Sequence, residues 1–130
     1  MANEHVVGIV RYKDQILLGK KRSDSSKGLA EKWHIPGETI KRNETDEQAL
    51  ERCFDEEASI EIIAGQYINS HFNDAGEEVR WYECFYLSGD LRARSDLEDV
   101  KWVDRKQVIP ICSKRAIGRW PKEVLEYFRR

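Results

Sequence analysis

The feature that most constrains this fold is an acid-rich amphipathic helix expected over residues 45–58. Thr45 is followed three residues later by Gln48, which is the spacing of a capping box at a helix N-terminus. Apolar side chains then recur every four residues and define one helical face: Leu50, Phe54 and Ala58. We expect this face to be buried, so the rest of the chain must build a core beside it.

Runs of β-branched and aromatic residues on both sides of this helix predict strands. The expected strands cover residues 5–12, 15–21, 60–63, 66–72, 78–87 and 100–103. Residues 22–32 are polar and predict a surface loop. A second helix is expected to open at Trp120-Pro121, with Pro121 at the first helical position. This order predicts one α+β domain over residues 1–130, a mixed β-sheet packed between helices.

The composition narrows the classes of function. The chain has 22 Lys and Arg against 24 Asp and Glu, and its net charge of −2 argues against a binder of duplex nucleic acid. This composition remains compatible with the binding of small phosphorylated ligands, which need only a local basic cluster. No apolar run approaches the roughly 20 residues of a membrane helix, and no signal-peptide pattern is visible. The cysteines are widely spaced and form no CxxC pair, which predicts a reducing, cytoplasmic setting.

Two adjacent carboxylates, Glu56 and Glu57, lie beside the apolar face of the helix, and Cys53 falls between them on a helical wheel. Like charges this close repel each other, and partial burial strengthens the repulsion. A divalent cation would relieve it, and carboxylate oxygens favour Mg²⁺ or Mn²⁺ over Zn²⁺. The helix alone leaves a second interpretation open, in which these acids are a solvated surface.

The wider segment 37–60 resembles the signature of the Nudix hydrolases. That signature is a Gly, five residues, a Glu, seven residues, and then Arg-Glu-apolar-x-Glu-Glu-x-Gly-apolar. Six of its nine specified positions match: Glu44, Arg52, Phe54, Glu56, Glu57 and Ile60. WHIPGE at 33–38 is similar to the Trp-x-x-Pro-Gly-Gly entry of that family, and LEDVKWV at 97–103 is similar to its acidic segment before a Trp-bearing strand.

Three positions depart from the signature. Glu38 replaces the first Gly, Cys53 replaces the Glu after Arg52, and Ser59 replaces the last Gly. Ser59 makes a left-handed helix exit costlier than Gly would. In the family, the Glu that Cys53 replaces commonly helps to bind metal or to activate water. Nearby carboxylates disfavour a Cys53 thiolate, so we interpret Cys53 as a small, semi-apolar filler.

The resemblance implies a Nudix-type α/β/α sandwich and a Mg²⁺- or Mn²⁺-dependent pyrophosphohydrolase. Its substrate would be a nucleoside diphosphate linked to another moiety, such as a nucleotide-sugar or a nucleoside triphosphate. The loss of a carboxylate at position 53 favours an alternative, a catalytically attenuated Nudix-fold module that binds nucleotides. The implied metal ligands are Glu56, Glu57 and, through its backbone carbonyl, Glu38.

The same resemblance assigns Arg52 to orient a carboxylate and Glu44 to ligate the metal or support a ligand. Glu98 is the candidate for an extra ligand or base, with a solvated loop acid as its alternative. The candidate substrate-binding residues are Arg22, Trp33, Arg80 and Trp81. Trp33 could equally serve packing alone. An exposed aromatic load, expected at Trp81, Trp120 and Tyr127, leaves room for a homodimer.

Overall fold

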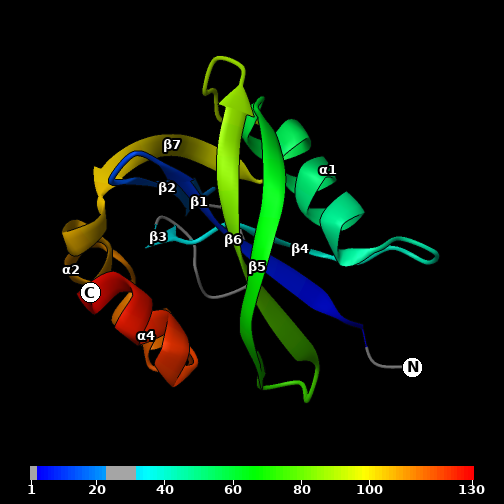
Figure 1. Cartoon of the computed structure of the whole chain (residues 1–130). Helices are drawn as coiled ribbons and strands as arrows, with labels where there is room; N and C mark the ends of the chain where they lie inside the picture. The colour runs from blue at the N-terminus through cyan, green and yellow to red at the C-terminus, as the bar shows by residue number, and fades with distance from the viewer. Residues whose placement is uncertain (1–2, 23–31) are drawn as a thin grey trace.

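The computed structural model describes residues 3–22 and 32–130, so most of the surface loop predicted over 22–32 lies outside the described residues. Within them, seven strands form one mixed sheet in the order β3-β2-β1-β6-β5, with β4 paired to β1 and β7 to β2 (Figure 1). The strands are β1 (His5–Tyr12), β2 (Gln15–Lys21), β3 (Trp33–His34), β4 (Gly37–Thr39), β5 (Glu61–Phe72), β6 (Glu78–Ser88) and β7 (Leu97–Asp104). β1 and β6 run parallel, and the other pairs are antiparallel.

Helices cover both faces of this sheet (Figure 1). They are α1 (Asp46–Ala58), the 3₁₀ turn η1 (Arg105–Gln107), α2 (Val108–Ile111), α3 (Lys114–Ile117) and α4 (Lys122–Arg129). One core forms where α1 packs on the sheet, and a second core forms under α2 and α4. The predicted α/β/α sandwich is therefore confirmed. In the described part of the chain, no helix is long and apolar enough to cross a membrane.

The acid-rich helix forms as its sequence predicts. Thr45 Oγ1 accepts from the N–H of Gln48, and the Gln48 side chain accepts from the N–H of Thr45, which completes the capping box. The helix ends at Ser59 in the left-handed region, with φ of 61°. Gly8 of β1 lets the helix approach the sheet closely, because a Cβ there would lie 2.7 Å from the Phe54 ring. The helix that carries the acidic pair is therefore fixed at both ends and along its buried face.

Several boundaries differ from the prediction. The two strands expected at 60–63 and 66–72 are one continuous strand, β5, which absorbs the interruption as register shifts against β6. β7 begins earlier than expected because Leu97 pairs with Lys21. Pro121 is the N-cap of α4, one position before the first helical residue.

The expectation of exposed aromatic rings was wrong for three side chains. The exposed fractions are only 2% for Trp81, 9% for Trp120 and 4% for Tyr127. All three pack in the core under α2 and α4, where the rings of Trp81 and Trp120 meet edge to face at 5.4 Å. The sequence alone could not show that the C-terminal helices fold back over β6.

Candidate active site

Arg52, in the middle of α1, is the centre of a carboxylate cluster. Its Nε donates to Oε2 of Glu44 at 2.8 Å, and its Nη2 donates to Oε1 of Glu44 at 3.0 Å and to the carbonyl of Thr39 at 2.9 Å. These hydrogen bonds lower the pKa of Glu44 to about 2, so this carboxylate stays ionised at neutral pH. The bidentate pair ties α1 to the end of β4 and fixes the orientation of both side chains.

Two further carboxylates lie on the other side of the same guanidinium. Nη1 of Arg52 is 3.6 Å from Oε2 of Glu38 and 3.7 Å from Oε2 of Glu56. Glu38 is brought there because β4 pairs with β1 in a register that sets Glu38 opposite Val6. The Glu56 side chain is 48% exposed. The structure thus brings together three residues that match the signature, Glu44, Arg52 and Glu56, with Glu38, which departs from it.

Glu57 stands apart from this group because it is buried, with an exposed fraction of 3%. Burial raises the pKa of Glu57, and the neighbouring Glu38 and Asp96 act in the same direction. Cys53 Sγ donates to Oε2 of Glu57 at 3.1 Å. Burial and Glu57 raise the pKa of the Cys53 thiol far above its ordinary value, so it remains a neutral donor. Cys53 is a buried filler, as expected, and it is also a hydrogen-bond partner of Glu57.

Glu57 opens into a cavity of about 200 Å³ between α1, β4 and the start of β7. Its charged lining consists of Lys21, Glu38, Glu57 and Asp96. A second cavity of about 280 Å³ lies under α3 and shares three lining residues with the first: Val7, His34 and Val79. The two cavities are therefore adjacent, and we call them together the elongated cleft, with carboxylates at one end and the rings of Trp81 and Trp120 at the other.

His34 lies where the two cavities meet. It is 6% exposed, and its Nδ1 has no hydrogen-bond partner among the described residues. Burial, followed by the charge of Lys21, lowers the pKa of His34 to about 4, so the ring is neutral at pH 7. A buried polar atom without a partner is costly in a folded protein. Nδ1 is itself shielded from solvent, so the His34 ring forms part of the wall between the two cavities.

Asp96 was not among the residues selected from the sequence, yet it lines the carboxylate end of the cleft together with Lys21. The backbone N–H of Arg94 donates to the carbonyl of Glu57 at 2.9 Å, which holds the segment before β7 against the end of α1. Glu98, the residue chosen from that segment, instead lies 3.5 Å from Lys20 Nζ and lines neither cavity. The pairing of β7 with β2 therefore decides that Asp96 lines the cavity while Glu98 lies beside Lys20.

The four candidate substrate-binding residues fall in different places. Trp81 lines the second cavity, and its Nε1 donates to Nδ1 of His71 at 3.1 Å. Arg80 points to the other face of the sheet, where Asp46 accepts two hydrogen bonds from it at 2.8 Å and Glu4 and Glu78 bind it as well.

Trp33 packs beneath Lys101, whose Nζ lies 4.2 Å from the ring centroid. The backbone N–H of Arg22 donates to the carbonyl of Asp96. Trp81 is therefore the one candidate of these four that lines the cleft formed by the described residues.

The donors at the carboxylate end suit a hard cation. Glu38, Glu57 and Asp96 line one cavity, where burial first, and then the charges of Glu38 and Asp96, raise the pKa of Glu57. Oxygen donors of this kind match Mg²⁺ or Mn²⁺. Across residues 3–22 and 32–130, however, no three His, Cys, Asp or Glu side chains are close enough to hold a metal as they stand. Rotation of the half-exposed Glu56 is one way to complete such a set.

Comparisons with known proteins identify the family of this chain. The family model described as NUDIX domain matches residues 3–128. The CTP pyrophosphohydrolase of Escherichia coli K12 is 26% identical over 125 residues, which span 95% of this chain and 80% of that protein. The low-salt glycan biosynthesis protein Agl8 of Haloferax volcanii is 30% identical over 71 residues, 53% of this chain and 44% of Agl8. The chain therefore aligns with less than half of Agl8.

Solved structures share the fold over almost the whole chain. The solution structure of the E. coli ORF135 protein has a TM-score of 0.70 at 21% identity and covers 98% of this chain and 86% of its own. The crystal structure of an ADP-ribose pyrophosphatase from Streptococcus suis has a TM-score of 0.75 at 13% identity, and the match covers 99% of this chain and 91% of that protein. The match to the family model, the shared fold and the signature residues on α1 lead to one conclusion: this chain belongs to the NUDIX family of hydrolases.

Proposed function

We propose that this chain is a divalent-cation-dependent pyrophosphohydrolase that acts on a nucleoside triphosphate or a related nucleoside diphosphate derivative. The observation that carries the proposal is the elongated cleft, which joins a carboxylate end at Glu57 to an aromatic end at Trp81 and Trp120. A nucleotide needs a cation near its phosphate chain and apolar walls around its nucleoside, and the two ends of the cleft offer these two environments. The similarity to a CTP pyrophosphohydrolase supports the same class of substrate.

At the carboxylate end, the residues that would hold Mg²⁺ or Mn²⁺ are Glu57, Glu56, Asp96 and the backbone carbonyl of Glu38. When bound, the cation supplies electrostatic stabilisation of the charge on the phosphates. Lys21 lines the same cavity with an exposed fraction of 8% and offers a compact positive charge to a phosphate oxygen.

Arg52 acts by position. It donates to Glu44 and lies within 3.7 Å of both Glu38 and Glu56, so it restrains the carboxylates that face the reacting phosphates. Loss of Arg52 would leave three acids mutually repelling and free to reorient. We propose that Arg52 and Glu44 position the other carboxylates, as the resemblance implies. We propose that Asp96, and not Glu98, is the additional acid that faces the cavity.

At the aromatic end, the neutral His34 ring lies between the two cavities, while Trp81 and Trp120 form the apolar wall. Arg115 and Arg119 lie at the rim of the same cavity. This combination suits a nucleoside, because the rings can cover the apolar faces of its base and the two arginines can donate to its polar groups.

The decisive experiment is a panel of nucleoside triphosphates, nucleotide-sugars and ADP-ribose assayed for release of phosphate-containing products with Mg²⁺ or Mn²⁺. We expect turnover of at least one compound, its loss in EDTA, and a drop of about two orders of magnitude or more in Glu57→Gln. Glu61→Gln, which changes an exposed acid at the start of β5, is the matched control. Absence of turnover with every compound, in folded protein that binds the cation, would exclude this function.

A second candidate function is nucleotide binding with little hydrolysis, and Cys53 is the observation that favours it. The thiol is buried and its pKa is raised, so it cannot replace the base or ligand that a Glu supplies at this position in the family. If this candidate is right, Cys53→Glu raises turnover at least about tenfold in the presence of Mg²⁺. If turnover of the unmodified protein is already efficient and Cys53→Glu does not raise it, the first function stands.

A further inference from the structure

His71 of β5 lies at the aromatic end of the cleft, beside Trp81. The register of β5 against β6 sets His71 opposite Val79 and Asn69 opposite Trp81, so His71 and Trp81 are diagonal neighbours on one face of the sheet. Their ring centroids are 6.2 Å apart, and both side chains line the cavity of about 280 Å³. The pairing of the two strands therefore brings an imidazole to the end of the cleft that suits a nucleoside.

Trp81 determines which nitrogen of His71 carries the hydrogen. Nε1 of Trp81 can only donate, and it lies 3.1 Å from Nδ1 of His71, so Nδ1 is the acceptor. Burial, followed by the charge of Arg119, lowers the pKa of His71, so the ring is neutral at pH 7. A neutral imidazole has one N–H, which is then on Nε2. The ring therefore presents a donor at its other nitrogen.

Nε2 of His71 is within reach of a ligand. Among the described residues it has no hydrogen-bond partner, and the one fully buried side-chain nitrogen or oxygen without a partner is Nδ1 of His34. Nε2 therefore keeps contact with solvent, on a side chain that lines the cavity. A ligand that fills the cavity displaces this solvent and has to offer Nε2–H an acceptor, because an unpaired donor is costly.

The neighbouring side chains of this cavity offer a ligand few acceptors. Oδ1 of Asn73 already accepts from two backbone N–H groups of its own turn, at 2.9 and 3.0 Å. Oδ2 of Asp74 lies 2.7 Å from Nη2 of Arg119. The guanidinium groups of Arg119 and Arg115 carry donors only. The polar groups that remain for a ligand here are therefore mainly donors.

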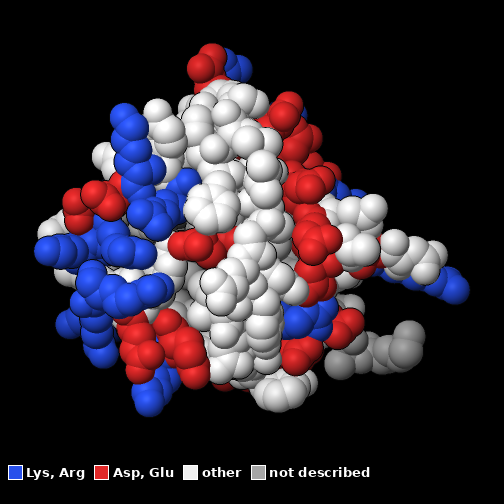
Figure 2. Space-filling model, viewed as in Figure 1, with Lys and Arg blue, Asp and Glu red and all other residues white. Residues whose placement is uncertain are grey.

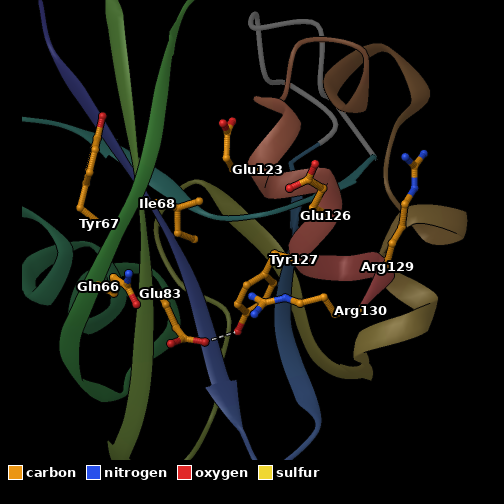
Figure 3. Close-up of a pocket in the computed structure, with 9 residues that line it drawn as sticks. All are labelled: Gln66, Tyr67, Ile68, Glu83, Glu123, Glu126, Tyr127, Arg129 and Arg130. Atoms are coloured by element: carbon orange, nitrogen blue, oxygen red, sulfur yellow. Dashed lines mark hydrogen bonds between the residues drawn. The ribbon is translucent and has the colours of Figure 1, made fainter.

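Helix α4 is tied to the sheet, so the wall around His71 is largely preformed. Oη of Tyr127 donates to Oε2 of Glu83 (Figure 3). Nδ2 of Asn69, on β5, donates to Oε1 of Glu123 at 2.9 Å. Trp120 lies just before α4 and lines the same cavity as His71. In a cavity with such fixed walls, a single hydrogen bond can discriminate between similar ligands.

We propose that His71 is a specificity-determining residue whose Nε2–H donates to a carbonyl oxygen of the nucleobase, an inference that rests on the proposed function. Uracil, cytosine and guanine carry such an oxygen, whereas adenine carries an amino group and ring nitrogens. The amino group of adenine needs an acceptor, at an end of the cleft whose side chains offer mainly donors. The chain therefore prefers triphosphates of the carbonyl-bearing bases to ATP.

The test compares UTP, CTP, GTP and ATP, which share ribose and triphosphate, in the unmodified chain and in three variants. His71→Gln keeps an N–H near the position of Nε2. His71→Asn keeps an acceptor near Nδ1 but places no donor at Nε2, and His71→Phe keeps only the ring shape.

We expect kcat/KM for the best carbonyl-bearing triphosphate to exceed that for ATP at least about fivefold. For this triphosphate, His71→Asn and His71→Phe should raise KM about fivefold and change kcat less than about twofold, whereas His71→Gln should keep KM near its original value. His71→Asn should also narrow the difference between this triphosphate and ATP.

The strand that carries His71 also supplies the matched control. Elsewhere on β5 and β6, the face viewed in Figure 2 is an uncharged strip. Tyr67 of β5 is 45% exposed and lines the separate cavity between β5 and α4 (Figure 3). Tyr67→Phe removes one polar group from the same strand outside the cleft and should leave every KM unchanged. Circular dichroism checks the folding of each variant.

Long-range ¹H–¹⁵N NMR of the imidazole tests the hydrogen position without any turnover. The His71 signals, assigned by their loss in His71→Asn, should show a hydrogen on Nε2 and none on Nδ1. Addition of the best carbonyl-bearing triphosphate should shift the Nε2 signal. A hydrogen on Nδ1 would overturn the proposal, whatever the chain hydrolyses.

Two kinetic results would overturn it as well. If His71→Asn keeps KM and His71→Gln raises it, His71 serves only as the acceptor for Trp81. If ATP is turned over as well as the other three triphosphates, the base preference is wrong. If no compound is turned over, the proposed hydrolysis fails, and dissociation constants of the four triphosphates with Mg²⁺, from tryptophan fluorescence, decide on His71 by the same comparisons. Absence of binding by all four would also overturn the role of His71.

Discussion

Replacement of Cys53 by Glu restores the acid that the family signature has at this position, and the structure indicates that the change is costly without a cation. The side chain at 53 is fully buried, and its Sγ lies 3.1 Å from Oε2 of Glu57. Two unit charges about 4 Å apart at an effective dielectric constant of about 20 repel by about 4 kcal/mol. We therefore expect Cys53→Glu to lower the free energy of unfolding by about that amount, and the melting temperature by roughly 10–20 °C.

Cys53→Gln is the matched control, because Gln has nearly the shape of Glu but no charge. The difference in melting temperature between the two variants in EDTA isolates the repulsion with Glu57. Saturating Mg²⁺ should close most of that difference, since a bound cation compensates both carboxylates. Melting followed by circular dichroism, with and without Mg²⁺, gives all the values that are needed.

The pH dependence gives an independent check with a defined sign. A carboxyl whose pKa is raised in the folded state binds a proton more tightly there than in the unfolded chain, so it destabilises the fold increasingly as pH rises. The gap between Cys53→Glu and Cys53→Gln should widen as pH rises through the raised pKa and shrink as pH falls toward that of an ordinary carboxyl. Equal melting temperatures in EDTA at every pH would refute the reasoning, because they would mean that no charged Glu57 faces position 53.

Three further predictions concern single positions. Arg52→Gln should lower the free energy of unfolding by about 2–3 kcal/mol, because the substitution leaves Glu44 without its bidentate partner. The exposed Arg42→Gln is the control and should change the free energy of unfolding little, and urea titration measures both variants. Since Arg52 lowers the pKa of Glu44 to about 2, this pair stabilises the fold fully above about pH 4.5 and progressively less toward pH 2, and acid titration of Arg52→Gln should lack that contribution. Ser59→Gly should raise the free energy of unfolding by about 0.5–1 kcal/mol, seen as a higher melting temperature, because Ser59 occupies the left-handed region at φ 61°. His34→Leu should raise KM for the best nucleotide about tenfold with a smaller effect on kcat, because His34 lines both cavities of the cleft, and equal KM values would contradict that role.

The sequence by itself determined the parts of this protein that depend on near neighbours along the chain. The capping box at Thr45 and the four-residue apolar spacing through Phe54 fix α1, because caps and helical faces are set within one or two turns. The same local spacing sets Arg52, Glu56 and Glu57 on one helix, which is why the signature could be read directly. Alternation of strands and helices was enough to predict a sheet covered on both faces.

Only the tertiary structure decided which residues from distant segments reach the cleft. The choice of Asp96 over Glu98 depends on the register of β7 against β2 and on the contact of the preceding segment with the end of α1. The burial of His34 and its position between the two cavities follow from the packing of β3, which no local pattern in the sequence shows. Arg80 was taken for a ligand-binding residue, yet the fold turns it toward Asp46. Strand register and the docking of helices are set by contacts far apart in the chain, so local patterns do not carry that information.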